Sequence, residues 1–159
     1  MIQKLTGLKG QLNAFQRVML HWSELHPYNA AHTFHLAGPM RADALREAIG
    51  ETYRFNRLGL VELDEQGAYH HETDDTPELE VLSGGSSPER RLTEHLTGEL
   101  NRRFERPRCR PFRFSVVEAG PDRHYVGVTY DHWVADSIAT RLVLRHVLGR
   151  YLNIADPRC

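Results

Sequence analysis

The sequence predicts an α/β fold, specifically an α+β two-layer sandwich in which helices pack on a mixed β-sheet. Residues 41–54 have apolar side chains at helical spacing and predict an amphipathic helix. Residues 112–118 and 124–130 are two apolar segments separated by a Gly-Pro-Asp turn, which predicts a β-hairpin. Residues 134–152 are apolar on most faces and predict a largely buried helix.

The first half of the chain supplies further elements around the amphipathic helix. A short helix is expected over 13–23, and the proline in His26-Pro27 ends it. A strand follows over 30–37 and stops at Gly38-Pro39. After the helix at 41–54, we expect a hairpin of residues 58–63 and 68–72 with its turn at 64–67, an acidic loop over 73–78, and a short strand over 79–82.

The middle of the chain carries one more helix. Residues 83–87 are Ser-Gly-Gly-Ser-Ser and are expected to form a linker; they lack the Gly-Lys-Ser/Thr ending of a phosphate-binding loop. Ser87 resembles an N-cap, with Pro88 at the first helical position, so a helix is predicted from 88 to about 104. The prolines of residues 106–111 predict an extended segment.

Composition limits the classes of protein that the chain can represent. Its 159 residues suit a single domain over 1–159. The formal net charge is -1 and no basic stripe stands out, so nucleic acid is not an expected partner. No apolar run approaches the ~20 residues of a membrane span. Two cysteines, Cys109 and Cys159, make no disulfide framework, which favours a cytoplasmic location. Cys109 lies between two arginines that would lower its pKa, but a loop cysteine without a role is the simpler interpretation.

Residues 130–137, Tyr-Asp-His-Trp-Val-Ala-Asp-Ser, connect a predicted strand to a predicted helix and carry the candidate chemistry. His132 is a candidate general base because an imidazole accepts a proton near neutral pH. Asp136 is placed to cap the helix or to pair with an arginine. On spacing alone, a structural histidine and a plain N-cap remain open, since the His-x-x-x-Asp pattern also joins His70 to Asp74 and His71 to Asp75.

Asp131-His132-Trp133-Val134-Ala135-Asp136-Ser137 resembles the HHxxxDG signature of condensation domains, chloramphenicol acetyltransferases and related acyltransferases. The resemblance continues along nearly the whole chain in the same order. Residues 54–59, Arg-Phe-Asn-Arg-Leu-Gly, resemble the RHxxLR segment of condensation domains. The remaining matching segments are 12–20, 27–29, 36–40, 44–53 and 104–117.

The resemblance implies roles for individual residues. His132 matches the catalytic histidine, the base that activates a hydroxyl or amine for attack on an acyl thioester. Asp136 matches the aspartate of the catalytic motif, which supports the loop by pairing with an arginine, here Arg54. Trp133 would contact substrate. The signature's first histidine is Asp131 here and its glycine is Ser137, two departures at supporting positions; an acid at Asp131 would raise the pKa of its neighbour.

The resemblance also implies a co-substrate and a missing part. The acyl group would come from acyl-CoA or from a phosphopantetheine thioester on a carrier protein, as in secondary metabolism, with no bound cofactor. The chain resembles the N-terminal half alone and lacks a DFGWG-like motif, so it supplies one wall of the site. The other wall would come from a second copy, in a dimer or higher oligomer, or from a missing C-terminal half. Whether the chain is active alone is left open.

Two other functions compete with the acyltransferase. A non-catalytic half would keep the fold and dock a carrier protein or another partner, which the departures at Asp131 and Ser137 favour. A metal site is the weaker alternative, since adjacent strand residues point to opposite faces and His70 and His71 would not share one ion. No metal is therefore expected at the cluster formed by His70, His71, Glu72, Asp74 and Asp75.

Overall fold

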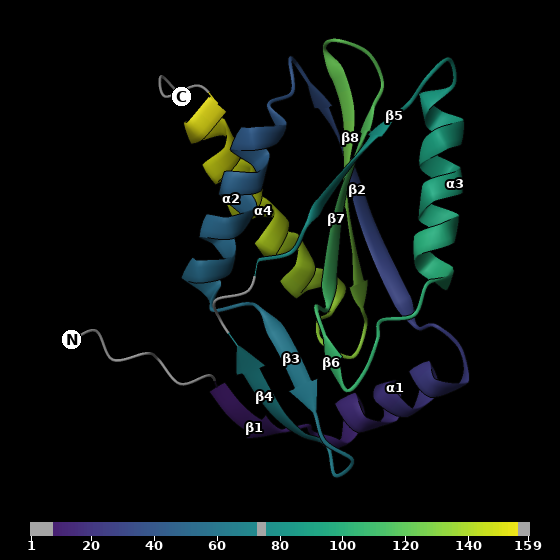
Figure 1. Ribbon diagram of the computed structural model, residues 1–159, viewed down its shortest axis with the longest axis vertical. Helices are drawn as coiled ribbons and strands as arrows, with labels where there is room; N and C mark the ends of the chain where they lie inside the picture. The colour runs from purple at the N-terminus through teal and green to yellow at the C-terminus, as the bar shows by residue number, and fades with distance from the viewer. Residues whose placement is uncertain (1–7, 73–75, 156–159) are drawn as a thin grey trace, which may run out of the picture.

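The computed structural model describes residues 8–72 and 76–155, and within these residues the chain forms two four-stranded sheets and four helices (Figure 1). In chain order the elements are β1 (Leu8–Gln11), α1 (Ala14–Leu25), β2 (Asn29–Ala37), α2 (Ala42–Asn56), β3 (Leu60–Leu63), β4 (Ala68–Glu72), β5 (Leu79–Ser83), α3 (Pro88–Asn101), β6 (Arg108–Cys109), β7 (Phe112–Glu118), β8 (Arg123–Asp131) and α4 (Ser137–Ala155).

One sheet has the strand order β2-β8-β7-β5 and confirms the predicted mixed sheet. β8 pairs antiparallel with β2 along all nine residues of both strands, from Asn29 opposite Asp131 to Ala37 opposite Arg123. β7 and β8 form the predicted hairpin, and β5 pairs with β7 in parallel. The sheet therefore brings the start of β2 beside the end of β8. There the chain enters residues 131–136, the connection to α4 that carries His132 and is called the histidine loop below.

Helices cover both faces of this sheet. α2 and α4 pack on one face and α3 lies against the other (Figure 1). The predicted stripe of α2 is confirmed, since Leu45, Ile49 and Tyr53 are buried against the sheet. Their partners come from the strands and from α4, which together form the main core: Phe112, Phe114, Val116, Val126, Val128, Tyr130, Leu144, Val147 and Tyr151.

The second sheet, β1-β4-β3-β6, was not expected from the sequence. The predicted hairpin of β3 and β4 lies at its centre, but β1 and β6 were missed because short segments become strands only through pairing. α1 lies beside this sheet (Figure 1), and Met19 of α1 joins a smaller core with Leu63 and Trp133.

Two predicted helix ends differ from the structure. α3 ends at Asn101 rather than near 104, because the backbone of Arg102 is extended; the Asn29 amide donates to the oxygens of Glu99 and Arg102 at this end, at 3.0 and 2.8 Å. α4 begins at Ser137 rather than 134, because residues 131–134 form a turn. Among the described residues, no helix is long and apolar enough to cross a membrane.

Leu45 tests the main core, since its side chain is 0% exposed between α2 and the sheet. Leu45→Ala removes buried methyl groups and leaves a cavity, so the free energy of unfolding should fall by about 2–5 kcal/mol. Urea denaturation measures the change. Leu152→Ala, at a side chain that is 50% exposed, is the matched control and should stay within about 0.5 kcal/mol of the parent protein. Equal losses in both variants would contradict this assignment of the core.

Candidate functional site

The histidine loop is a hydrogen-bonded turn at the end of β8. The N–H of Val134 donates to the carbonyl of Asp131 at 3.0 Å and closes the turn. His132 lies inside it, and its own N–H donates to the carbonyl of Tyr28 at 3.1 Å, just before β2. The backbone on which the His132 side chain stands is therefore bonded both within the loop and to the neighbouring segment.

The imidazole of His132 is held by two aromatic rings and one carbonyl. It stacks on Tyr28 with ring centroids 5.3 Å apart and planes at 13°, and it meets Tyr130 edge-on at 5.8 Å. Its Nδ1 lies 3.2 Å from the carbonyl oxygen of Ala135. Because a carbonyl only accepts hydrogen bonds, this contact assigns the proton to Nδ1 and leaves the lone pair on Nε2. Nε2 has no hydrogen-bond partner among the described residues, and the ring is half-buried.

Asp136 caps α4. Its Oδ1 accepts the N–H of Ala139 at 2.7 Å, and its backbone oxygen accepts both the N–H and the hydroxyl of Thr140. The pairing with Arg54 that the resemblance implies is not formed within the described residues. Arg54 is exposed, and its guanidinium lies beside Gly50 on α2. The ion pair between α2 and α4 is instead Glu51 with Arg150, at 3.6 Å.

Asp131 points into the protein. Its side chain is 3% exposed, and Oδ2 accepts a hydrogen bond from Nη2 of Arg106 at 3.1 Å. Burial raises the pKa of the Asp131 carboxyl, while the Arg106 guanidinium and, to a smaller extent, the N–H groups of Trp133 act to lower it. Arg106 comes from the segment between α3 and β6 and was not singled out in the sequence.

Trp133 and Ser137 differ in burial. Trp133 is buried in the smaller core and lines a cavity of about 190 Å³ with His71 and Pro111. Ser137 is exposed at the first position of α4. Tyr28, which stacks on His132, was also missed as a site residue; its position just ahead of the first predicted strand was the available signal. The substrate-contacting and supporting roles of Trp133 and Ser137 stay predictions.

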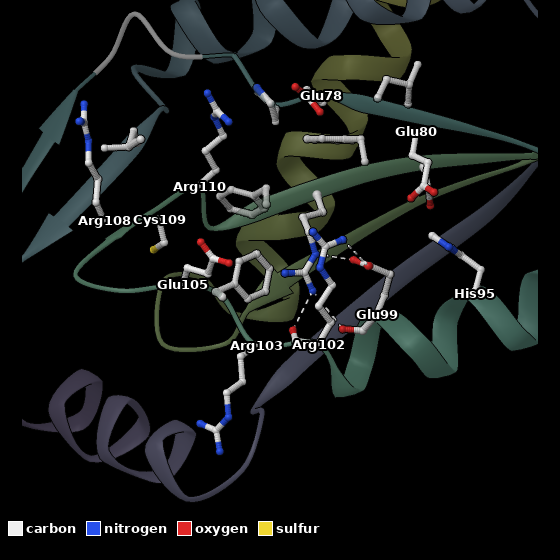
Figure 2. Close-up of a pocket in the computed structure, with 18 residues that line it drawn as sticks. Glu78, Glu80, His95, Glu99, Arg102, Arg103, Glu105, Arg108, Cys109 and Arg110 are labelled. Atoms are coloured by element: carbon white, nitrogen blue, oxygen red, sulfur yellow. Dashed lines mark hydrogen bonds and ion pairs between the residues drawn. The ribbon is translucent and has the colours of Figure 1, made fainter.

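A polar cavity of about 550 Å³ lies elsewhere, between α3, β5, β7 and the segment that follows α3 (Figure 2). Glu99 reaches into it and pairs with Arg113 and with Arg102, while Arg103 points away toward α1 (Figure 2). No residue of the histidine loop lines this cavity. A third cavity, of about 570 Å³, does reach the loop, because Tyr28, Arg106 and Asp131 line it.

Cys109 and the His70–Asp75 cluster were the other candidates. Cys109 is buried in the smaller core, and burial raises the pKa of its thiol to about 12, so the flanking arginines do not activate it. Asp74 and Asp75 lie outside the described residues, as does Cys159. Within the described part of the chain, no group of three or more His, Cys, Asp or Glu side chains is placed to hold a metal ion.

Comparison with known proteins identifies the fold. No family model matches the sequence, and neither does any curated protein. The starter condensation domain of the rhizomide synthetase RzmA matches with a TM-score of 0.81 over 93% of this chain and 38% of its own, at 16% identity. This is a condensation-domain fold. The first condensation domain of the calcium-dependent antibiotic synthetase, in complex with a substrate analogue, matches equally well, with a TM-score of 0.81 over 96% of this chain and 39% of its own, at 18% identity.

The chain spans only part of these condensation domains. Across the solved structures compared, it covers 36% to 41% of their length. One of them is an RzmA variant in complex with C8-CoA, with a TM-score of 0.81 at 16% identity. The chain therefore has the architecture of one portion of a condensation domain, which agrees with the chloramphenicol-acetyltransferase-like half that the resemblance implied.

Asp136→Ala tests the cap. Loss of the carboxylate leaves the N–H of Ala139 without its acceptor, so the free energy of unfolding should fall by about 1 kcal/mol in urea denaturation. Asp136→Ser keeps a side-chain acceptor and should recover most of that loss. If Arg54→Ala destabilises the protein as much as Asp136→Ala does, the two residues act together and the cap is not the main role of Asp136.

The raised pKa of Asp131 predicts a pH dependence. In the unfolded chain the pKa of the Asp131 carboxyl is its ordinary 3.8, which is lower than in the folded protein. As the pH rises above 3.8, the unfolded chain loses this proton before the folded protein does, and deprotonation therefore favours the unfolded state. The parent protein should thus lose stability, relative to Asp131→Asn, as the pH rises from about 4 through the raised pKa. Urea denaturation of both proteins across this range measures the difference. A difference that changes in the opposite direction would mean that Arg106 outweighs burial.

Proposed function

We propose that the chain is an acyltransferase domain, residues 1–159, that supplies one wall of a thioester-dependent active site with His132 as its general base. The observation that carries the proposal is the contact of His132 Nδ1 with the carbonyl of Ala135, because it leaves the Nε2 lone pair to accept a proton. The condensation-domain fold supports the reaction class, and the RzmA complex with C8-CoA supports an acyl-CoA or related thioester as donor.

In the proposed reaction His132 transfers one proton. Nε2 takes it from the hydroxyl or amine of the acceptor as that group attacks the thioester carbonyl. The carbon–sulfur bond breaks, the new ester or amide bond forms, and the proton passes from Nε2 to the departing thiolate. Tyr28 and the Ala135 carbonyl keep the ring in one orientation, and Asp136 fixes the start of α4 just beyond the loop.

The second wall of the site is proposed to come from another copy of the chain or from the other half of a longer enzyme. The compared condensation domains are more than twice as long as this chain. Ile138 and Leu142, in the first turns of α4 after the loop, are 63% and 53% exposed, and an apolar surface of this kind beside a candidate base suits a covering partner. A carrier protein in the cytoplasm is the proposed source of acceptor or donor groups.

A binding module is the second candidate. Asp131 is buried and paired with Arg106, and Ser137 stands where the signature has glycine, so the loop departs from the catalytic pattern at two positions. Such a domain would keep the fold and dock a carrier protein without turning over a thioester.

A thioester-cleavage assay separates the two candidates. The native chain is tested over a range of concentrations with a panel of acyl-CoA and acyl-carrier donors, each with hydroxyl and amine acceptors. His132→Gln should reduce turnover at least about 100-fold, the usual contribution of a general base. His95→Gln is the matched control, since His95 lines the cavity of Figure 2 and should leave turnover unchanged.

The concentration dependence tests the partner. Turnover that rises faster than linearly with protein concentration indicates a site completed by a second copy. Turnover that survives His132→Gln contradicts the proposal. A folded protein that turns over no donor at any concentration favours either a fragment that needs the other half of a longer enzyme or the binding module.

A further inference from the structure

Two arginines connect the segment after α3 to the C-terminal end of α1. Arg103 donates from its guanidinium to the backbone oxygens of Ser23, Glu24 and Leu25, at 2.7, 3.2 and 3.1 Å. Arg106 donates to the hydroxyl of Ser23 and, more weakly, to the oxygen of Leu20 at 3.4 Å. Both therefore bind the last turns of the helix that leads to Tyr28, the residue on which the His132 ring stacks.

Only Arg106 also bonds the histidine loop. Its Nη2 reaches Oδ2 of Asp131 at 3.1 Å, and the side chains of the pair are 23% and 3% exposed. The ion pair is thus shielded from water, where a charge-assisted hydrogen bond is strong and its geometry is restrictive.

Asp131 is joined directly to His132, and its backbone is hydrogen-bonded on both sides. It is the first residue of the turn, and its carbonyl accepts the N–H of Val134, while its own N–H donates to Pro111 on the neighbouring segment. Arg106 holds the Asp131 side chain in one orientation at the start of the turn, and the backbone bonds of Asp131 hold the adjoining peptide that leads into His132. The ring in turn depends on that peptide for the contact of Nδ1 with Ala135, which selects the tautomer.

We propose that Arg106 is a positioning residue for His132 and acts through Asp131. The guanidinium fixes the Asp131 side chain, the turn fixes the His132 backbone, and the imidazole keeps its proton on Nδ1. This inference rests on the proposed function, in which Nε2 is the basic atom. It adds a condition for the acid at position 131, where the resembled signature has a histidine. This acid keeps His132 in position only when a cation from the segment after α3 pairs with it.

The test observes the ring directly. Histidines labelled with ¹⁵N report by NMR which ring nitrogen carries the proton, and His132→Gln identifies the signals of His132. At about pH 8, where free imidazoles are neutral, the native chain should show a protonated Nδ1 and a bare Nε2 at well-separated shifts. In Arg106→Met the two shifts should move toward each other, because the ring samples both tautomers. Arg103→Met is the matched control: it also loosens the end of α1 but should leave both shifts unchanged.

Each outcome decides the proposal. Unchanged His132 shifts in a folded Arg106→Met overturn it, and so does an equal change in Arg103→Met, which would show that anchoring of α1 alone matters. If Arg106→Met does not fold, Asp131→Ala decides, because it removes the acceptor of Arg106 while the bonds of Arg106 to α1 remain; unchanged shifts there overturn the proposal. The result does not depend on turnover, so it remains valid if the acyltransferase function fails.

Discussion

The pairing of β2 with β8 determines where the candidate site lies. All nine residues of each strand are in register, so the start of β2 and the end of β8 lie side by side. Tyr28 precedes Asn29 and His132 follows Asp131, so this register places the two residues next to each other. The carbonyl of Tyr28 therefore accepts the N–H of His132, and the two rings stack. A slip of one residue would turn every side chain of β8 to the other face and separate the ring from its platform.

The sequence predicted the parts of the fold that depend on local pattern. The stripe of α2 and the β7–β8 hairpin were found because their periodicity is set by one or two neighbouring segments. β1 and β6 could not be found in the same way. β6 has only two residues, and β1 has Leu8 as its one large apolar residue; each is a strand because β4 or β3 provides hydrogen-bonding partners.

For the candidate site too, the sequence predicted the residues of a local motif and missed a partner that is distant in sequence. His132 and Asp136 were recognised because both occur within one short motif, and the cap of α4 by Asp136 is one of the roles that the spacing allowed. Arg106 is 25 residues from Asp131 in sequence, and nothing in its own neighbourhood marks it as a partner. The arginine that resemblance suggested, Arg54, lies on α2 instead, where the carboxylate of Asp136 does not reach it within the described residues.

The acid at position 131 is best understood together with its cation. A buried carboxylate without a partner is costly, and removal of one member of a buried pair typically destabilises a protein by about 3–5 kcal/mol. The buried Asp131 carboxylate therefore needs a cation within reach. Arg106 provides that cation, and its separate bonds to Ser23 and Leu20 hold the guanidinium at the end of α1. The anchoring of α1 thus provides the cation, and the departure from the signature at Asp131 is compatible with an ordered His132.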